Sequence, residues 1–401
     1  MSKIALVTGA CGFSGGHMVK ILHDEGVTVR GTDLSSAWES EHVRKCQENI
    51  GLDWNADGVE FVASDLLNRD SLSKVLKDVD IVYHTASLYD YSASMEALRR
   101  VNIDGTINLC EAMLDAGVDR MVHWSTAGVY GHPNMPRSSI NPLRMLFELF
   151  WGHGIRPWLS DKEYRRPAKH PTNQPFTEEG STPLNTEGGQ PRGSFLVNDY
   201  SITKWDQEQL IQKYGREKGL RYTIIRPAPL YGPGSDYGIG GIVIALSEGL
   251  APVLPLDLRN YLMVNCHIRD IGRAAYFVSR REDTVGEDYN VSDPTVISQL
   301  EFLRAAALLV GRKIHVMPFL RMPWVMPLGI WSSRYVRWLD RKFPMYERLR
   351  IWEESSARYL SCSYWISSNK LKSLGFEWEY PDFRLGLRDT VQWFIKVGWV
   401  K

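Results

Sequence analysis

A glycine motif near the N-terminus constrains the fold of this chain most strongly. Gly9, Gly12 and Gly15 stand three residues apart, after the apolar run of residues 3–8 and before a run with helical spacing. In such a strand–turn–helix unit, the first glycine makes the tight turn, the second lets a pyrophosphate approach the backbone, and the third lets the helix pack on the strand. The helix N-terminus presents free N–H groups to phosphates. The motif predicts a dinucleotide site; the alternative is a glycine-rich turn without a ligand.

Short apolar runs recur along the chain and indicate further buried parallel strands. They are expected at residues 3–8, 27–33, 59–63, 80–86, 120–124, 221–226 and 288–292. The sequence therefore predicts an α/β fold, a doubly wound parallel Rossmann sheet with helices on both faces. We expect residues 1–235 to form the dinucleotide-binding domain and 267–292 to return to it. Residues 236–401 should mainly form a smaller C-terminal substrate-binding domain.

An acidic residue ends the second expected strand. Asp33 lies 18 positions after Gly15, close to the spacing of about 20 at which an acid binds the ribose hydroxyls of a dinucleotide. Its carboxylate could accept both hydroxyls and would repel a 2′-phosphate, which favours NAD over NADP. Arg30 lies close in the chain and leaves NADP open as the less favoured cofactor. A solvated loop aspartate is the alternative.

Tyr200 and Lys204 form the candidate catalytic pair. They lie four apart in a run with helical character, so both side chains point from the same face of the helix. A phenol normally titrates near pH ~10, and a fixed positive charge close by favours the phenolate. The pair is therefore a plausible general base near neutral pH.

Other polar and small residues follow the expected strands, at the sheet edge where ligands bind. Asp65 could reach the adenine, and Ala86 leaves room for a cofactor. His84 is interpreted as a packed residue at a strand end. Asn102, within a long helix expected from 95 to 116, is either bonded to the backbone or part of a proton path to Lys204.

Ser125 and Thr126 follow the fifth expected strand, where a hydroxyl could hold the reacting oxygen of a substrate against Tyr200. Taken together, the motifs resemble those of the extended short-chain dehydrogenase/reductase family. They are Thr8-Gly-x-x-Gly-x-x-Gly15, Asp33, Asp65-Leu66, Asn102, Ser125-Thr126, Tyr200-x-x-x-Lys204 and Arg226-Pro227, in the family's order. In this family the second hydroxyl of the pair works with the tyrosine, which is Thr126 here, with Ser125 as its neighbour.

The residues and the resemblance together give one set of expected site residues. The catalytic residues are Tyr200, Lys204, Thr126 and Ser125. The cofactor-binding residues are Gly9, Gly12, Phe13, Ser14, Gly15, Asp33, Asp65, Leu66, Ala86, Asn102, Tyr200, Lys204 and Pro227. The resemblance also implies a homodimer through the helices at 95–116 and 199–218.

Two departures from the family bear on the substrate. Dehydratases carry an Asp-Glu pair directly after the catalytic threonine, where this chain has Ala127 and Gly128. Many nucleotide-sugar enzymes carry an asparagine at the position of Pro229. The motif form is closer to that of 3β-hydroxysteroid and sterol-4-carboxylate dehydrogenases. We therefore expect an NAD-dependent oxidoreductase that interconverts an alcohol and a ketone on a hydrophobic, sterol- or lipid-like substrate, with decarboxylation if a carboxylate lies beta to the ketone.

Two alternatives remain for the activity. One is a nucleotide-sugar epimerase or reductase, which would share the fold and the cofactor. The other is a non-catalytic dinucleotide-binding scaffold, which the presence of Tyr200, Lys204 and Thr126 disfavours.

Two segments depart from an ordinary α/β pattern. The insertion at 132–197 precedes the catalytic helix and reads either as a lid over the substrate or as a surface insertion or oligomer contact. In residues 316–352 aromatic side chains alternate with Arg and Lys, and Pro interrupts. This segment could lie on a membrane surface, or its tryptophans could pack inward in a helix pair.

Charge and cysteine content narrow the remaining options. The chain has 47 basic and 47 acidic side chains, and the Lys and Arg are not gathered into one block, so we expect no nucleic-acid partner. Its five cysteines are scattered without metal-ligand spacing, which predicts no metal site and a reducing compartment. No uncharged run approaches the ~18 residues of a spanning helix. We expect a cytoplasmic protein, with membrane association through 316–352 as the open question.

Overall fold

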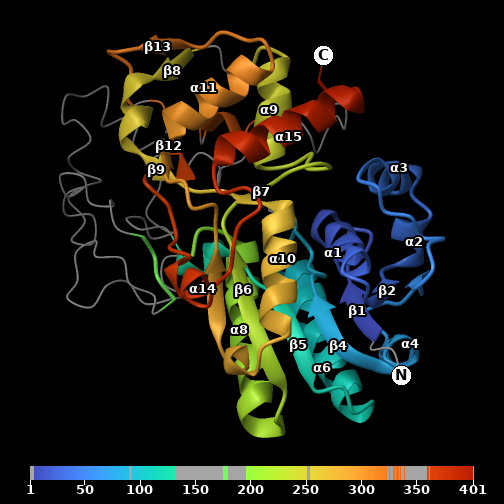
Figure 1. The fold of residues 1–401 in the computed structure, drawn as a ribbon. Helices are drawn as coiled ribbons and strands as arrows, with labels where there is room; N and C mark the ends of the chain where they lie inside the picture. Colours follow the sequence, from blue (N-terminus) through green and yellow to red (C-terminus); the bar gives the residue numbers. More distant parts are fainter. Residues whose placement is uncertain are drawn as a thin grey trace, which may run out of the picture.

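A parallel β-sheet lies at the centre of the computed structural model (Figure 1). The structure describes residues 4–89, 93–131, 175–178, 196–250, 253–322, 359–360 and 362–400, with several residues between 325 and 338. The sheet has seven strands in the order β11-β6-β5-β4-β1-β2-β3, and every pairing is parallel. The strands are β1 (Ile4–Thr8), β2 (Thr28–Thr32), β3 (Val59–Phe61), β4 (Val79–His84), β5 (Arg120–Trp124), β6 (Arg221–Pro227) and β11 (Asp288–Val291).

Helices cover both faces of this sheet, which confirms the predicted doubly wound α/β class. On one face, α1 (Phe13–Asp24) and α10 (Ile268–Ser279) contribute buried residues to one core cluster. On the other, α4 (Arg69–Val75), α6 (Gly105–Asp115) and α8 (Asp199–Lys218) share a second cluster. The strands between them are almost wholly buried, as expected for a sheet covered on both sides.

The helix expected from 95 to 116 is not a continuous α-helix. It consists of α5 (Met95–Arg99), a π-helical segment η1 (Arg100–Asp104) and α6. A π-turn inserts one extra residue per turn and is frequent at functional sites. Asn102 lies in this turn and is fully buried.

A smaller group of elements lies above the sheet in Figure 1 and has its own apolar core. It contains α9 (Ile239–Ser247), α11 (Gln299–Leu309) and α15 (Phe383–Lys396). Short strand pairs complete it, namely β8 (Val253–Pro255) with β13 (His315–Met317) and β9 (Leu262–Met263) with β12 (Ile297–Ser298). Between the two cores, β7 (Leu230–Tyr231) pairs with β10 (Cys266–His267).

Most of the insertion at 132–197 lies outside the described residues. Its described part packs on the protein body. Phe176 stacks on Tyr130 at 5.1 Å between ring centroids, and its backbone bonds to Trp365 and Ser367 near the C-terminus. The remaining helices are α2 (Ser35–Trp38), α3 (Glu41–Asn49), η2 (Ala127–Tyr130), η5 (Leu256–Asn260), η6 (Glu282–Thr284) and α14 (Asn369–Ser373).

Candidate active site

The glycine turn between β1 and α1 forms a tight cradle. Gly9 has φ +71°, and a Cβ on it would lie 2.8 Å from Cα of Ala86. A Cβ on Gly15 would lie 2.0 Å from the Gly9 carbonyl oxygen, which no side chain allows. Helix α1 starts at Phe13 and Ser14, with no side chain capping its N-terminus and no acid in its first turn. These free N–H groups and the exposed backbone fit a pyrophosphate.

Asp33 lies beside this turn. One carboxylate oxygen accepts a hydrogen bond from the backbone N–H of Cys11 at 2.9 Å, and the other accepts one from Leu34 at 2.8 Å. Burial raises the pKa of Asp33, while these two backbone hydrogen bonds oppose the shift. The carboxylate is thus fixed at the carboxyl end of β2, where an adenosine ribose would be expected.

The other expected cofactor residues follow neighbouring strands at the same edge of the sheet. The Asp65 carboxylate accepts from the N–H of Leu67 at 2.9 Å. Leu66 packs against Gly105, where a Cβ would lie 2.9 Å from it. The N–H of Ala86 points to the Thr8 hydroxyl at 3.3 Å. Pro227 ends β6 and is buried.

Helix α8 carries Tyr200 and Lys204. Its N-terminus is capped by the Asn198 side chain, which accepts from the N–H of Ser201 at 2.8 Å, and Gly219 ends it in the left-handed conformation. The Lys204 ammonium is 2% exposed and donates to the Trp124 carbonyl at 2.6 Å, the Gln207 side-chain oxygen at 2.6 Å and the Ser87 hydroxyl at 3.0 Å.

Burial determines the charge state of Lys204. Desolvation lowers the pKa of Lys204 to about 7, and the negative charge of Glu208 opposes this only in part. At neutral pH the ammonium is therefore poised between its charged and neutral forms. Its bond to the Trp124 carbonyl also holds the end of β5 against α8.

Two further tyrosines surround Tyr200, and they were not predicted from the sequence. Tyr200 is 8% exposed, and its ring meets the edge of Tyr89 at 4.8 Å between centroids. Tyr89 in turn meets Tyr237 at 5.2 Å. Tyr89 itself is half-exposed. These residues come from the loops after β4 and β7, and nothing in the local sequence pairs them with α8.

The hydroxyl pair after β5 divides into two environments. Thr126 is half-buried, and its hydroxyl accepts from the N–H of Gly128 at 3.1 Å, which caps η2. The Ser125 hydroxyl is buried and has no hydrogen-bond partner in the described part of the chain. Gly128 lies against α8, since a Cβ on it would be 2.7 Å from the Ser201 hydroxyl.

Asn102 bonds to the backbone rather than to Lys204, which answers the question left open by the sequence. Its side-chain oxygen accepts from the N–H of Leu88 at 2.7 Å, and its amide donates to the Thr203 hydroxyl at 3.1 Å. The described contacts of Lys204 do not include it. Asn102 therefore ties the loop after β4 to α8.

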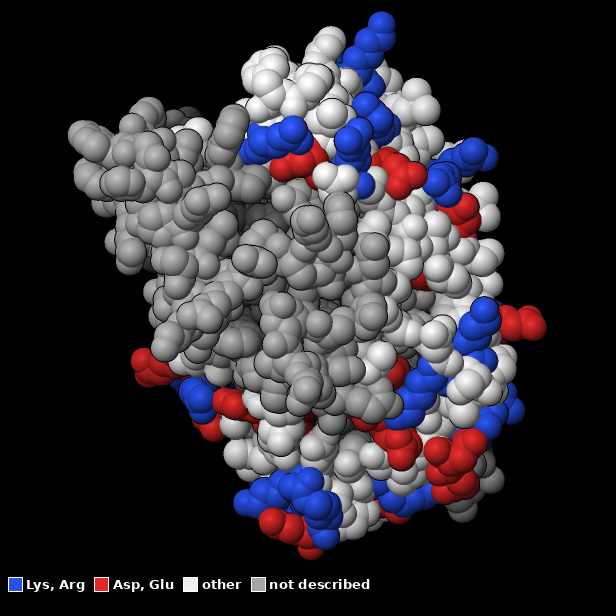
Figure 2. Space-filling view, turned by 90° about the vertical axis from the view of Figure 1, so that its left-hand side faces the viewer, with Lys and Arg blue, Asp and Glu red and all other residues white. Residues whose placement is uncertain are grey.

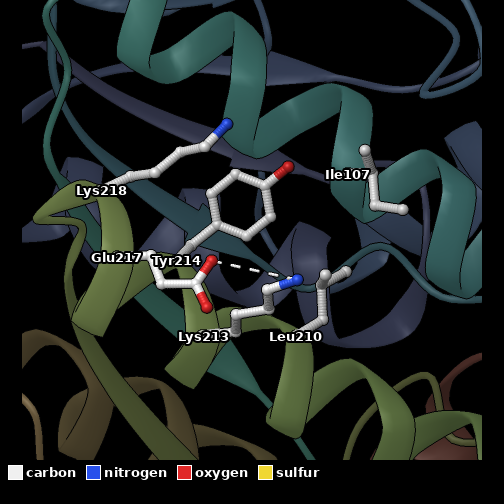
Figure 3. Close-up of a pocket in the computed structure, with 6 residues that line it drawn as sticks. All are labelled: Ile107, Leu210, Lys213, Tyr214, Glu217 and Lys218. Carbon is white, nitrogen blue, oxygen red and sulfur yellow. Dashed lines mark ion pairs between the residues drawn. The ribbon is translucent and has the colours of Figure 1, made fainter.

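A shallow hollow of about 220 Å³ lies at the far end of α8 (Figure 3). An ion pair between Lys213 and Glu217 borders it at 3.9 Å. It is lined by Ile107, Leu210, Lys213, Tyr214, Glu217 and Lys218. None of the expected site residues lines it, so it is not part of the site built around Tyr200. No group of His, Cys, Asp and Glu side chains within the described ranges is arranged to hold a metal ion.

Comparison with known proteins identifies the family. Residues 5–145 and 181–292, more than half of the chain, match the model of the NAD dependent epimerase/dehydratase family. The chain belongs to this family. It is an enzyme of the extended short-chain dehydrogenase/reductase type, and its cofactor is NAD.

Individual relatives are more distant. The chain is 23% identical to short-chain dehydrogenase/reductase family 42E member 1 of Xenopus laevis, over 100% of this chain and 90% of the relative. It is 24% identical to 3beta-hydroxysteroid-dehydrogenase/decarboxylase isoform 1 of Arabidopsis thaliana, over 97% and 79%. The fold matches the Thermus thermophilus UDP-glucose 4-epimerase complex with NAD, with a TM-score of 0.61, 20% identity and 98% and 99% of the two chains covered.

Proposed function

We propose that this enzyme interconverts a secondary alcohol and a ketone on a hydrophobic, sterol-like substrate, with NAD as the hydride carrier. The observation that carries the proposal is the burial of Tyr200 and Lys204 on one face of α8, with the ammonium bonded to the end of β5. This arrangement puts a phenol beside a buried positive charge at the sheet edge where the cofactor binds.

Each residue has a defined role in this proposal. NAD supplies the hydride acceptor, which no side chain provides. Tyr200 removes the proton of the substrate hydroxyl, and the Lys204 charge stabilises the resulting phenolate. Thr126 orients the substrate oxygen. The turn at Gly9, Gly12 and Gly15, with Phe13 and Ser14, holds the pyrophosphate, and Asp33 holds the ribose. In the reductive direction Tyr200 returns the proton.

Steric limits favour a lipid-like substrate over a dehydratase reaction. Gly128 has no room for the acid that dehydratases carry at this position, because a Cβ there would meet Ser201 at 2.7 Å. The aromatic rings of Tyr89 and Tyr237 beside Tyr200 suit an apolar ring system. The name of the Arabidopsis relative, a 3beta-hydroxysteroid-dehydrogenase/decarboxylase, points the same way. If the substrate carries a carboxylate beta to the new ketone, loss of CO₂ follows.

A nucleotide-sugar epimerase is the second candidate. It is favoured by the match of the whole fold to a UDP-glucose 4-epimerase. An epimerase would use the same Tyr200 and Lys204 but would return the hydride to its substrate, and would therefore release no net NADH.

One substrate panel tests the proposal. The protein is incubated with NAD and, in separate reactions, a 3β-hydroxysterol, its 4-carboxy form and UDP-glucose, and NADH is followed by absorbance. We expect NADH with at least one sterol and CO₂ with the 4-carboxy form. NADH with none of the sterols, together with conversion of UDP-glucose to UDP-galactose, would reject the lipid proposal in favour of the epimerase.

Two partner proposals accompany this function. We propose a homodimer through the helices at 95–116 and 199–218, on the side of α6 and α8 that carries the hollow in Figure 3. We also propose that residues 316–352 contact a membrane surface from the C-terminal part, residues 236–401 outside 267–292, which forms the substrate side. Neither proposal requires a spanning segment, and the described helices include none long and apolar enough to cross a bilayer.

A further inference from the structure

A buried polar network extends from Lys204 away from the substrate side. Its first member is Gln207, three residues later on α8 and 0% exposed. The Gln207 side-chain oxygen accepts from the Lys204 ammonium at 2.6 Å. A buried ammonium must have its donors satisfied, and Gln207 provides one of its three described acceptors.

The ammonium fixes how the Gln207 amide is oriented. Lys204 can only donate, so the side-chain oxygen of Gln207 must face it and the amide nitrogen must face the other way. That nitrogen has two N–H groups and two neighbours, the Thr106 hydroxyl at 2.7 Å and His84 Nε2 at 3.2 Å. The Thr106 hydroxyl already donates to the Asn102 carbonyl at 2.7 Å and is free to accept.

The same logic assigns the tautomer of His84. Because Gln207 donates to Nε2, this nitrogen accepts and the ring proton lies on Nδ1. Nδ1 then donates to the Thr8 hydroxyl at 2.9 Å. Burial lowers the pKa of His84 to about 3, with the charge of Lys204 as a second cause, so the ring is neutral. Thr8 is the last residue of β1 and precedes Gly9 of the cofactor turn.

We propose that Gln207 is a positioning residue that holds the catalytic Lys204 ammonium and connects it, through His84 and Thr8, to the glycine turn of the cofactor site. The connection runs through α8, β4 and β1, and all four side chains are at most 2% exposed. Its hydrogen bonds have a single direction, from Lys204 to Gln207, from Gln207 to His84 and from His84 to Thr8.

The charged surroundings of Lys204 give Gln207 its importance. His84 on β4 and His123 on β5 are neutral, because burial lowers the pKa of both. Tyr200 lies one turn away on α8. The full positive charge of Arg226 on β6 is paired with Glu208, with nitrogen–oxygen distances of 2.8 and 2.7 Å. Neutral acceptors therefore carry most of the stabilisation of the Lys204 ammonium.

Direct titration of Lys204 tests this proposal in protein without cofactor, so the result does not depend on the proposed substrate. The side chain is followed by ¹³C NMR in lysine-labelled protein and assigned with Lys204→Ala. The wild type should titrate near pH 7. Gln207→Leu removes an acceptor of a charged donor and should lower the proton affinity of Lys204 at least tenfold. Gln207→Glu should raise it by at least as much.

Gln209→Leu is the matched control, because Gln209 is exposed on the same helix and should leave the titration unchanged. A second readout is NADH binding by fluorescence across the same pH range. Binding should weaken as Lys204 loses its charge, at lower pH in Gln207→Leu and at higher pH in Gln207→Glu than in the wild type.

Equal titration of Lys204 in Gln207→Leu, Gln209→Leu and the wild type would overturn the proposal. If Gln207→Leu does not fold, Gln207→Glu alone decides, since a Lys204 titration at or below the wild-type pH would also overturn it. Loss of NADH binding with unchanged Lys204 titration would assign Gln207 a purely structural role and would likewise reject it.

Discussion

Gly15 and Gly16 are neighbours in the first turns of α1, but the space around them differs. A Cβ on Gly15 would lie 2.0 Å from the Gly9 carbonyl oxygen, which is backbone and cannot move aside. A Cβ on Gly16 would lie 3.1 Å from the amide nitrogen of Gln47, at the end of a flexible side chain. The helix itself would gain from alanine at either position. The difference between the two sites is therefore a property of the cofactor turn.

We expect Gly15→Ala to destabilise the protein by about 1–3 kcal/mol, the usual range for overpacking, and to abolish NAD binding. Gly16→Ala should change stability by less than about 1 kcal/mol, because helix propensity offsets a mild contact. Urea denaturation and NAD titration calorimetry measure both effects. Equal behaviour of the two variants would mean that the turn is not the close-packed cradle described here.

Asp293 provides a pH-dependent prediction at the contact between the two cores. It is 1% exposed, accepts from the Tyr231 hydroxyl at 2.7 Å and the His267 N–H at 3.1 Å, and burial raises the pKa of Asp293 to about 8. Because this value lies above the unfolded value of 3.8, the stabilisation is complete below pH 4 and is lost as the pH rises through 8.

Asp293→Asn should remove this loss, because an amide cannot ionise. We expect the variant to gain a few kcal/mol over the wild type at pH 9, at about 1.4 kcal/mol per pKa unit, and to gain nothing at pH 4. Thermal unfolding of both proteins across this range measures the difference. Parallel stability curves would show that Asp293 is ionised in the folded protein.

The residue pairs that could be predicted from the sequence are those within one element. Tyr200 and Lys204 share a helix face by their spacing, and the glycines of the cofactor turn are consecutive in the chain. Gln207 lies on the same face, but its partners His84 and Thr8 come from β4 and β1. Contacts of this kind depend on the strand order, and no local pattern records them.

At the scale of elements, the strands were predicted well and one helix was not. Each buried parallel strand is a compact apolar run, so all seven strands of the sheet could be located. The π-helical turn at 100–104 could not. It adds one residue to a single turn, which hardly changes the apolar periodicity, and it is stabilised by the distant bonds of Asn102 to Leu88 and Thr203.

The helical residues described between 322 and 338 have two different faces. Met322, Gly329 and Ser333 are buried. Leu328, Trp331, Tyr335 and Trp338 are about half-exposed, and the three aromatic rings stack in series at 5.9 and 5.7 Å. The interpretation in which the tryptophans pack inward is thus wrong for Trp331 and Trp338.

Charge supports a lipid contact for this aromatic face. Residues 302–339 contain no Asp or Glu, and they contain Arg304, Arg312, Lys313, Arg321, Arg334 and Arg337. At the top of Figure 2, at the height of α11 and β13 in Figure 1, Lys and Arg surround uncharged surface. Exposed aromatics with basic neighbours are typical of proteins that lie on anionic membranes.

We expect the protein to sediment with vesicles that contain phosphatidylserine and not with phosphatidylcholine alone. The double variant Trp331→Ser, Tyr335→Ser should bind these vesicles at least tenfold more weakly, because it loses its interfacial aromatics. Leu385→Ser, Ile395→Ser is the control, since both residues are about half-exposed on α15. Failure of the wild type to sediment, or equal loss in both variants, would reject the lipid contact.

At the scale of the whole molecule, the chain builds two cores and returns to the first. After β7 it forms much of the second core, then α10 and β11 rejoin the sheet beside β6. The amphipathic pattern at 267–292 predicted this return. The packing of Phe176 between Tyr130 and residues 365–367 could not be foreseen, because it joins an insertion to the C-terminal end of the chain.

A homodimer through α6 and α8 would bury the apolar side chains between them. Ile107 and Leu210 are only half-buried in the single chain and line the hollow in Figure 3. We expect Ile107→Glu, Leu210→Glu to raise the dimer dissociation constant at least 100-fold, because two charges would be buried without partners. Analytical ultracentrifugation measures it, with Ile395→Glu as the control. A monomeric wild type would exclude the dimer.

The central claim is that the Tyr200 hydroxyl transfers the proton during oxidation, and the most direct test is the rate of NADH formation by Tyr200→Phe on the sterol that the wild type oxidises. Tyr214→Phe, on the same helix but in the distant hollow, is the control. We predict a loss of about 10²–10⁴-fold, the usual contribution of a general base, with NAD binding retained and Tyr214→Phe unaffected. A Tyr200→Phe rate within a few-fold of the wild type would contradict this account.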